Sequence, residues 1–331
     1  MIPGKITAIV LNWNGGGFVV QCLESLLEQT YPDLEVLVID NGSHDGSLEV
    51  IRERFRDLPR LEMGENLGYC RANNRAIPYA DGEFLLFLNT DVVLEPDYLQ
   101  RAVSSFAADR RIGMVAGKLL RFGGERVDST GQFLARSRKT IERGFNRPVD
   151  KKFEKPGPVF SVCGAAALYR KQMVAELEIG TEFFDEDFFA FHEDLDVGWR
   201  AQTFGWKGVY NPAAVAYHFR GGWLQSSRKG RSRAFPLRFA SPEIQFHIVK
   251  NRYLAILKND TLAAYLRDLP FILTRDLFLM GYLLIRRPSV IYRLFRERRL
   301  FRRALEKREF IRRMLGRENF RPGRIGRRKA I

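Results

Sequence analysis

Short apolar runs alternate with amphipathic segments over the first 120 residues, and this alternation restricts the possible folds more than any other feature of the chain. We expect strands at residues 6–11, 34–40, 60–63, 83–89 and 112–120, and helices at residues 17–29, 46–56, 69–79 and 96–108. Strands that alternate with helices form a mostly parallel sheet with helices on both faces. The sequence therefore predicts a doubly wound α/β sheet.

The same domain is expected to continue to about residue 240. Residues 122–158 are rich in Gly, Arg and Lys without a clear period, and we expect hairpins and an insertion there. A strand over residues 159–168, a helix that begins near His192 and a strand over residues 209–218 then complete the sheet. The predicted division is an α/β domain over residues 1–240 and a helical, basic region over residues 241–331.

Residues 219–240, at the end of the first domain, include three glycines and five arginines. This composition is equally typical of a flexible loop that covers phosphate groups and of a plain linker. Both interpretations stay open.

The positive charge of the chain is concentrated in its last segment. The formal net charge is +15, but residues 286–331 contain 18 Lys or Arg and only 4 Glu, a net charge of +14. A nucleic-acid interface normally belongs to the folded body, where basic residues are interleaved with base-reading groups. A segregated polycation favours an anionic membrane surface, and no nucleic-acid partner is expected. A basic nucleic-acid-binding protein remains the alternative from a different class.

Cysteine usage and the N-terminus indicate a cytoplasmic setting. Cys22, Cys70 and Cys163 are odd in number and far apart, which gives neither a disulfide framework nor a CxxC metal site. Met1 leads directly into the first strand, without the pattern of a signal peptide. We expect a cytoplasmic protein, peripheral at the inner face of the cell membrane.

The C-terminal region carries two stretches that are candidates for membrane contact. Residues 262–285 are the most apolar helical stretch, but Arg267, Asp268, Arg275 and Asp276 fall within it and occupy about half of the helix circumference. Pro270 is expected to interrupt the helix. This pattern favours an in-plane interfacial helix over a membrane span, and a buried core helix is equally compatible.

The second stretch, residues 290–315, is predicted to form an amphipathic helix whose apolar face enters the headgroup region. Its apolar residues, spaced by arginines, are Ile291, Leu294, Phe295, Phe301, Leu305, Ile311, Met314 and Leu315. The alternative is a basic helical pair that packs on the body or mediates oligomers.

Polar side chains follow the ends of three predicted strands. Asp91 comes after the apolar run Glu83-Phe-Leu-Leu-Phe-Leu-Asn89, Asp40 precedes a Gly/Asn/Ser turn, and Asn66 follows the third strand. Because ligands of α/β sheets bind at the carboxyl edge of the strands, these residues predict a nucleotide pocket in which a metal cation neutralises Asp91. Taken one at a time, each is more typical of an ordinary turn or helix cap.

Six motifs, in this order and spacing, resemble those of the family 2 glycosyltransferases of the GT-A fold, in particular the rhamnosyltransferase-like branch. They are Val10-Leu-Asn-Trp-Asn14, Asp40-Asn-Gly-Ser-His-Asp-Gly-Ser47, Asn66-Leu-Gly68 with Asn74, Leu88-Asn-Thr-Asp91 with Pro96-Asp97, His192-Glu-Asp-Leu-Asp-Val-Gly-Trp-Arg200, and Lys250-Asn-Arg-Tyr-Leu254. The resemblance covers roughly residues 5 to 260. By contrast, Asn12-Trp-Asn-Gly-Gly-Gly17 lacks the glycine spacing of a dinucleotide-binding oxidoreductase.

The resemblance implies inverting transfer of a sugar, with rhamnose favoured, from a nucleotide-diphosphate sugar with the help of Mg²⁺ or Mn²⁺. The donor would be dTDP-rhamnose or a UDP-sugar, and the acceptor a hydroxyl of a glycan or of a polyprenyl-diphosphate-linked chain in cell-surface polysaccharide synthesis. A polyprenyl-phosphate sugar synthase is the alternative within the enzymes.

The resemblance also assigns roles to individual residues. Asp194 is the expected catalytic base, Glu193 the acceptor-binding residue, and Asp91 and His218 the metal ligands. The expected nucleotide-sugar-binding residues are Asn12, Asn14, Asp40, Asn66, Arg71, Asn74 and Asn89. Asn89 departs from the family, which often has Asp at this first position of the metal motif.

Physical chemistry adds two expectations for the helix that follows His192. The aromatic-rich run Phe183-Phe-Asp-Glu-Asp-Phe-Phe-Ala-Phe191 should raise the pKa of the Asp194 carboxyl by desolvation, as a general base requires. Asp196 and Arg200, at i and i+4, are expected to form a structural ion pair.

Overall fold

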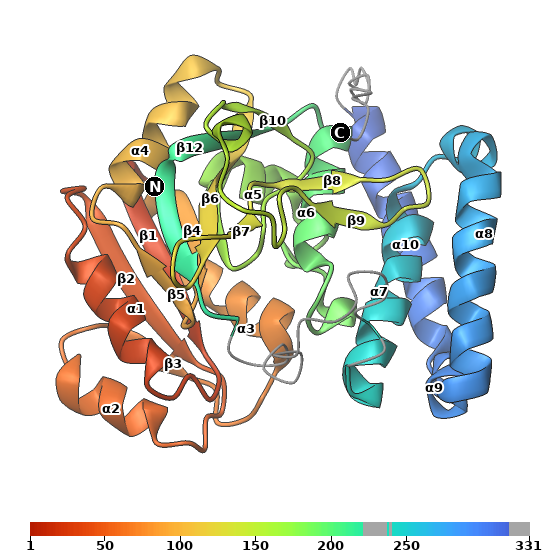
Figure 1. Cartoon of the computed structure of the whole chain (residues 1–331), viewed down its shortest axis with the longest axis horizontal. Coiled ribbons are helices and arrows are strands. Elements are labelled where there is room, and N and C mark those ends of the chain that lie inside the picture. The colour runs from red at the N-terminus through yellow and green to blue at the C-terminus, as the bar shows by residue number, and fades with distance from the viewer. Residues whose placement is uncertain (221–236, 238–239, 318–331) are drawn as a thin grey trace.

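The computed structural model describes residues 1–220, residue 237 and residues 240–317. A ten-stranded mixed sheet lies at the centre, in the order β10-β12-β6-β11-β4-β1-β2-β3, with β5 beside β12 and β7 beside β6 (Figure 1). A separate hairpin, β8–β9, lies on the side of the sheet toward the C-terminal helices. Most of the segment 219–240, for which a phosphate-covering loop or a linker was expected, and the tail 318–331 lie outside the described residues.

The strands and helices have the following bounds. The strands are β1 Ile2–Asn12, β2 Leu34–Asp40, β3 Arg60–Glu62, β4 Gly82–Asn89, β5 Val92–Leu94, β6 Ile112–Arg121, β7 Val127–Ser129, β8 Gln132–Leu134, β9 Thr140–Glu142, β10 Gly157–Val159, β11 Ala166–Arg170 and β12 Lys207–His218. The α-helices are α1 Phe18–Leu27, α2 Ser47–Arg54, α3 Gly68–Ala76, α4 Tyr98–Ser104, α5 Lys171–Leu177, α6 Glu193–Thr203, α7 Pro242–Asn259, α8 Leu262–Arg286, α9 Pro288–Arg296 and α10 Arg298–Arg317. Short 3₁₀ turns are η1 Ile77–Tyr79, η2 Ser105–Ala108, η3 Lys151–Phe153 and η4 Glu186–Phe188.

The predicted α/β alternation is confirmed over the first 120 residues. β1, β2, β3 and β4 pair in parallel, as crossovers through helices require. Two details differ. β5, which the sequence pattern missed, pairs antiparallel with β12, and the expected strand 159–168 is divided into β10 and β11. β11 then runs antiparallel between β4 and β6, so the sheet is mixed.

Alternating side chains of the central strands supply two hydrophobic layers. On one face, Ala8 and Val10 pack with residues of α1, α2 and α4, and on the other face Ile9 packs in a cluster that includes residues of α3, α5 and α6. Leu254 of α7 and Ala304 of α10 belong to the second cluster. The first and last of the four C-terminal helices therefore share the core of the sheet.

α7 is attached to the sheet domain by buried polar contacts as well. Lys258, with a fully buried side chain, donates to Asp185 and, at 3.0 Å, to Asp196. Asp196 also forms the predicted i,i+4 ion pair with Arg200 at 3.1 Å, and both of these side chains are buried. The Asn251 amide donates to carbonyls of Phe188, Ala190 and Phe191. The Lys250–Leu254 motif thus holds the loop that leads into α6.

One expectation for the C-terminal helices was wrong. Pro270 does not interrupt the helix, because α8 continues through it from Leu262 to Arg286. In α10, Ile311 is only 6% exposed and Phe301 packs against the main core cluster, so these two side chains face the body rather than a membrane. Within the described part of the chain, none of the helices combines the length and the apolar composition needed for a membrane crossing.

Candidate active site

The carboxyl ends of β1 and β2 form the first part of the candidate site. The Asn12 amide donates to Asp40 Oδ1 at 2.8 Å and to Ser47 Oγ at 2.9 Å, while Asp40 Oδ2 accepts from the amides of Gly42 and Ser43. Both side chains are buried, so they shape the turn after β2. Asn12 Oδ1 has no hydrogen-bond partner among the described residues.

Asn14 continues this edge from the loop after β1. It has a positive φ of 53°, which Asn tolerates better than most residues. The side-chain Oδ1 of Asn14 accepts from the backbone amide of His44 at 2.8 Å, and the backbone amide of Asn14 donates to Ser43 Oγ. The neighbouring Gly15 is close to both Asn12 and Thr90, where an added Cβ would lie 2.5 Å from Asn12 Oδ1. The ends of β1 and β4 are therefore in contact.

The loop before α3 is held by Asn41, which contacts both Asn66 and Leu67. Asn41 Nδ2 donates to Asn66 Oδ1 at 3.0 Å, and Asn41 Oδ1 accepts from the Leu67 amide. Gly68 is required here, because its φ is 79° and an added Cβ would lie 2.5 Å from the Phe189 ring. Asn66 thus lies beside Asp40 at the same sheet edge.

Arg71 and Asn74 of α3 have protein partners on the far side of this loop. Both amide atoms of Asn74 bind the backbone of Phe184, and Asn74 is 8% exposed. Arg71 Nε donates to Glu186 at 2.7 Å, with half of its side chain exposed. Asn74 therefore holds the aromatic loop, the aromatic-rich run from Phe183 to Phe191, whereas Arg71 lies at the surface.

A chain of alternating charges connects Asp91, after β4, to β12. His218 Nε2 lies 3.3 Å from Asp91 Oδ1, and His218 Nδ1 lies 2.8 Å from Asp128 Oδ2. The Arg220 guanidinium donates to the other oxygen of Asp128 at 2.6 Å. The two predicted metal ligands, Asp91 and His218, are therefore in contact, and Asp128 of β7 orients the imidazole.

The pKa values of Asp128 and His218 in this row of charged side chains follow from burial and from the neighbouring charges. Burial disfavours the ionised form of Asp128, but Arg220 and His218 outweigh it and lower its pKa to about 2. Burial would lower the pKa of His218, but its hydrogen bonds to Asp128 and Asp91 outweigh burial and raise the pKa to about 9. In the absence of a cation, a proton is therefore held between His218 and its two carboxylates.

These residues fit a divalent cation. A histidine that donates from one ring nitrogen to a carboxylate presents the other nitrogen to a metal, and here Asp128 takes Nδ1 while Nε2 faces Asp91. A carboxylate oxygen with one imidazole is a donor set that suits Mn²⁺ and, through the carboxylate, Mg²⁺. The cation would take the place of the proton that His218 Nε2 otherwise shares with Asp91.

Asp194 lies in the first turn of α6 and is held by three donors. Gln132 Nε2 of β8 donates to its Oδ2 at 2.7 Å, as does the Gly164 amide at 3.0 Å, and the Leu195 amide donates to Oδ1 at 2.7 Å. Burial raises the pKa of Asp194, although these hydrogen bonds oppose the shift. The direction agrees with the expectation for a general base.

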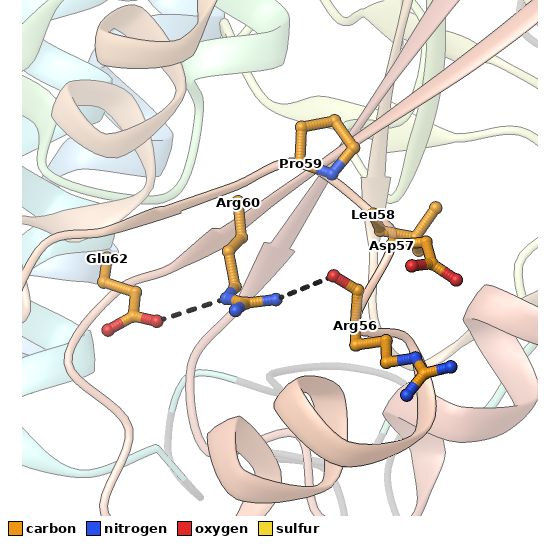
Figure 2. Close-up of a pocket in the computed structure, with 6 residues that line it drawn as sticks. All are labelled: Arg56, Asp57, Leu58, Pro59, Arg60 and Glu62. Carbon is orange, nitrogen blue, oxygen red and sulfur yellow. Dashed lines mark hydrogen bonds and ion pairs between the residues drawn. The ribbon is translucent and has the colours of Figure 1, made fainter.

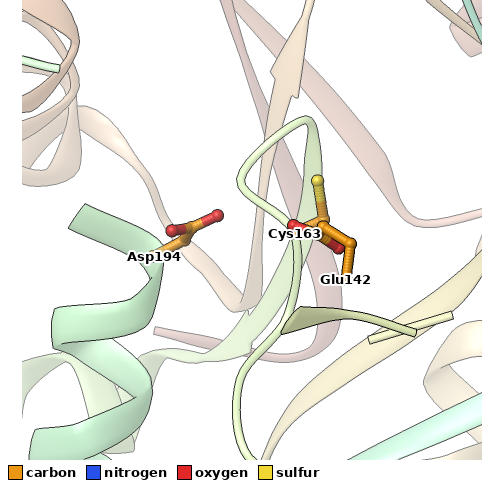
Figure 3. Close-up of side chains that lie close together, drawn as sticks. All are labelled: Glu142, Cys163 and Asp194. Carbon is orange, nitrogen blue, oxygen red and sulfur yellow. The ribbon is translucent and has the colours of Figure 1, made fainter. Parts of the chain in front are cut away.

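Glu142 of β9 and Cys163 converge on Asp194 (Figure 3). One ligand atom from each of the three residues lies within 4.8 Å of the others, an arrangement that can resemble a metal site. Metals bind the thiolate form of Cys, but burial raises the pKa of the Cys163 thiol well above its usual value. Burial and the nearby Asp194 also raise the pKa of Glu142 to about 7. We therefore interpret the cluster as part of the proton-handling side of the site.

Glu193 precedes Asp194 in the first turn of α6. It is 8% exposed, its Oε2 has no hydrogen-bond partner among the described residues, and burial together with Asp194 raises its pKa to about 8. Glu193 and Asp194 both approach Gly164, where an added Cβ would lie 3.4 Å from Glu193 Oε1. A side chain at position 164 would therefore disturb both carboxyl groups.

The metal side and the base side of the site meet at residues 163–165. Arg220, Asp128, Glu142 and Asp194 all influence the Cys163 thiol electrostatically. Two residues further on, the Ala165 carbonyl accepts from the amide of Asn89 at the end of β4. The predicted residues from β1, β2, β4, α6 and β12 therefore surround one edge of the sheet.

A separate hollow lies elsewhere on the sheet and carries no such chemistry. It is lined by Arg56, Asp57, Leu58, Pro59, Arg60 and Glu62 (Figure 2). Arg60 there contacts the Arg56 carbonyl and the Glu62 carboxylate. Most of its lining precedes or begins β3, whereas ligands of parallel strands bind beyond their carboxyl ends.

Three residues of the site were missed by sequence reasoning. Asp128, Gln132 and Glu142 all come from residues 122–158, where hairpins were expected but no individual strand was assigned. Their partners lie far away in sequence, 90 residues for Asp128 and His218 and 62 residues for Gln132 and Asp194. The only local signal is the polar run Asp128-Ser-Thr-Gly-Gln132, which interrupts an otherwise basic segment.

Known structures share this fold. A mannosyltransferase from Pyrobaculum calidifontis, solved in complex with GDP-Man and Mn²⁺, has a TM-score of 0.54 and 18% identity, over 94% of this chain and 85% of that one. TarS 1–349 from S. aureus has a TM-score of 0.57 and 18% identity, over 91% and 81%. The architecture is therefore the GT-A glycosyltransferase fold.

Sequence relatives agree with this architecture. The poly-β-1,6-N-acetyl-D-glucosamine synthase of Staphylococcus epidermidis is 22% identical over 214 residues, 64% of this chain and 49% of the relative. The chondroitin synthase of Escherichia coli is 30% identical over 139 residues, 41% and 18% of the two chains. The matched region thus spans half or less of each of these relatives. The sequence profile described as "Glycosyl transferase family 2" matches residues 7–178, more than half of the chain. The chain therefore belongs to glycosyl transferase family 2.

Proposed function

We propose that this protein transfers a sugar from a nucleotide-diphosphate sugar to a hydroxyl group, with inversion at the anomeric carbon. The observation that carries the proposal is that the Asp91–His218 pair, through Asp128, and the Asp194 carboxylate meet at Cys163, because Asp128 binds His218 and both Asp128 and Asp194 interact electrostatically with the Cys163 thiol. One side suits a departing diphosphate and the other suits a proton acceptor. Family membership supports the reaction class.

Asp194 has the role of general base. The acceptor hydroxyl gives its proton to the Asp194 carboxylate while its oxygen forms a bond to the anomeric carbon. At the same time the bond between that carbon and the diphosphate oxygen breaks, and the electron pair leaves with the nucleoside diphosphate. Gln132 and the Gly164 amide keep Asp194 Oδ2 in a fixed orientation, which avoids a cost of reorientation during the reaction.

Asp91 and His218 would hold Mg²⁺ or Mn²⁺, whose charge compensates the negative charge that develops on the departing diphosphate. Asp128 keeps the His218 proton on Nδ1, so that Nε2 stays available. Arg220 neutralises Asp128, which limits the negative charge near the phosphates.

The nucleotide part of the donor would bind along the edge formed by the predicted residues Asn12, Asn14, Asp40, Asn66, Arg71, Asn74 and Asn89. Asp40, Asn66 and Asn74 contribute by shaping the loops, since their hydrogen bonds go to the protein. Arg71 is half-exposed and available to base or phosphate once it leaves Glu186. Glu193, with its unpartnered Oε2, would bind the acceptor.

For substrates, we favour rhamnose from dTDP-rhamnose, or another sugar from a UDP donor, and an acceptor that is a glycan or a polyprenyl-diphosphate-linked chain. The support is the set of rhamnosyltransferase-like motifs and the basic region 286–317, which suits work at the cytoplasmic face of a membrane. A polyprenyl-phosphate sugar synthase is the second candidate, because the same fold and charge would serve it.

A donor screen tests the proposal. Nucleotide release would be measured with dTDP-rhamnose and common UDP- and GDP-sugars, in Mn²⁺, in Mg²⁺ and in excess EDTA. We expect release from one donor class that depends on the cation and increases with a polyprenyl-diphosphate-linked glycan. A larger increase with free polyprenyl phosphate would favour the second candidate, and no release from any donor would contradict the proposal.

A further inference from the structure

α8 turns its acidic side chains toward the body of the protein. Asp268 is 3% exposed and accepts from Arg136 at 2.8 Å and from Arg138 at 2.9 Å. Asp276 accepts from Arg252 of α7 at 2.8 Å. The two acidic residues of α8 are therefore matched by arginines of the β8–β9 hairpin and of α7.

The outward side of α8 is apolar. A single stripe, which we call the α8 stripe, consists of Leu262, Leu266, Pro270, Leu273, Leu277, Gly281 and Leu284. Its five leucines are 67%, 57%, 47%, 73% and 61% exposed, in chain order. Phe271, Phe278 and Ile285 are exposed directly beside it, at 46%, 63% and 80%. The stripe contains no charged residue, and Arg267 next to it folds onto Asp268 at 3.0 Å.

A surface helix usually buries an apolar side and exposes its charges. α8 buries Ile272, Leu279 and Leu283 in this way, but its outward side is apolar as well. Contiguous exposed apolar surface of this kind marks a site of interaction with a protein or a membrane. In Figure 1, α8 lies at the edge of the molecule, on the opposite side from α1 and α2. The stripe is therefore accessible to a large flat partner.

Positive charge follows the stripe along the chain. Among the described side chains, the exposed arginines of α8, α9 and α10 are Arg267, Arg286, Arg296, Arg298, Arg299, Arg302, Arg303, Arg312 and Arg313. A second copy of this chain would bring the same positive charge to the interface, and the two sets would repel each other. An anionic bilayer offers both an apolar layer and the complementary negative charge.

We infer that the α8 stripe is a docking surface for an anionic membrane. The leucines and Phe278 enter the boundary between headgroups and acyl chains, with α8 parallel to the surface. The arginines of α9 and α10 bind lipid phosphates. This assigns membrane contact to α8, whereas Phe301 and Ile311 of α10 attach the helices to the body.

The β8–β9 hairpin connects this surface to the candidate active site. At one end Gln132 binds Asp194, and at the other end Arg136 and Arg138 bind Asp268. The Arg136 guanidinium also lies 3.9 Å above the centre of the Phe271 ring. Arg136 lies four positions after Gln132 in the sequence, which corresponds to roughly 13 Å of extended chain. Asp194 is thus held close to the bilayer surface, which suits a lipid-linked acceptor, and this last step rests on the proposed function.

Vesicle flotation tests the docking surface. The full chain would be floated with vesicles of phosphatidylcholine and phosphatidylglycerol, and with phosphatidylcholine alone. The double variant Leu273→Glu/Leu277→Glu places two negative charges on the stripe. The matched control, Leu27→Glu/Tyr79→Glu, changes two exposed apolar residues, 55% and 63% exposed, on α1 and η1.

We expect wild type and control to float with the anionic vesicles, and the partition coefficient of the double variant to fall at least tenfold. Flotation of the double variant equal to wild type would overturn the inference. So would a wild type that does not float and sediments as a dimer, if the double variant sediments as a monomer. Circular dichroism verifies that each variant is folded.

A second readout separates this inference from the proposed function. The double variant should keep wild-type nucleotide release with a short water-soluble acceptor, because the stripe does not contact the strand-end residues. Flotation without any sugar transfer would contradict the proposed function and leave the docking surface supported. Transfer to the soluble acceptor by a wild type that does not float would support the proposed function and contradict the docking surface.

Discussion

Gln132 Nε2 lies 2.7 Å from Oδ2 of Asp194 and 2.7 Å from Oε1 of Glu142. An amide group has two hydrogens, and this geometry uses one for each carboxylate. The orientation of the candidate base therefore depends on a side chain of a three-residue strand. The protonation of Asp194 is also linked to that of Glu142, because two carboxyl groups in close proximity do not ionise independently.

Glu142→Gln should shift the acid limb of the pH–rate profile to lower pH. Two nearby carboxylates disfavour each other's ionised form, so removal of the Glu142 carboxyl group lowers the pKa of the base. The measurement is kcat/KM against pH at saturating Mn²⁺. Glu154→Gln, which changes a half-exposed glutamate paired with Lys118, serves as the control. A limb that does not move would show that Glu142 and Asp194 titrate independently.

Asp194→Asn should reduce turnover by about 10²–10⁴-fold, the usual effect of removing a positioned base. Binding of the nucleoside diphosphate should change little, because the amide keeps the shape of the carboxylate. Turnover with a soluble acceptor and calorimetric titration with the nucleotide would separate the two effects. Retention of more than roughly a tenth of wild-type turnover would assign the base to another residue.

Asp91→Ala should remove cation-dependent nucleotide binding. The carboxylate is the charged member of the proposed donor set, and His218 alone would hold Mn²⁺ weakly. Calorimetry with UDP and dTDP, with and without Mn²⁺, measures this directly. Asp97→Ala, an exposed carboxylate a few residues further along the chain, is the matched control. Full activity of wild type in excess EDTA would contradict the metal assignment altogether.

Asp128→Asn should weaken Mn²⁺ binding by about 10–100-fold, the range found when the carboxylate partner of a ligating histidine is removed. The physical reason is that an amide holds the His218 proton on Nδ1 less firmly than a carboxylate. Titration of bound Mn²⁺ by electron paramagnetic resonance gives the affinity. The chain offers a control in Glu243→Gln, since Glu243 contacts His247 Nε2 at 3.0 Å on α7. Equal affinities for both variants would leave Asp128 without a role at the metal.

Lys258→Met should lower the free energy of unfolding by about 3–5 kcal/mol, because it leaves Asp185 and Asp196 buried without their shared cation. Urea unfolding monitored by tryptophan fluorescence would measure it. Lys207→Met removes a pair with Asp109 in which the lysine side chain is 61% exposed, and we expect a loss of about 0–1 kcal/mol. Similar losses for the two variants would mean that burial does not strengthen the Lys258 contacts.

Residues at the ends of long elements could be predicted from the sequence. Asp91 and His218 end or follow apolar strands and Asp194 begins a helix, so local pattern and motif spacing located them. Asp128, Gln132 and Glu142 could not be found in this way. They belong to strands of three residues, whose pairing depends on distant partners and leaves no period in the sequence.

The type of a side chain also did not predict its hydrogen-bond partner. Asn74 has the amide of a nucleotide-binding residue, but both of its polar atoms bind the backbone of Phe184. In α8, the positions of the charges around the helix were correct. Which side of α8 faces the protein depends on Arg138 and Arg252. These residues lie 130 positions from Asp268 and 24 positions from Asp276 in the sequence.

Lys258 and Asn251 of α7 have a consequence for the evolution of this chain. Many enzymes acquire new partners when a lineage exchanges one module for another across a linker. Here the aromatic loop before Asp194 relies on carbonyl contacts with Asn251, and the buried Asp185 and Asp196 rely on Lys258. A foreign C-terminal region would have to reproduce these contacts at the same positions. New properties of the candidate active site are therefore expected to arise by point substitution rather than by exchange of the C-terminal region.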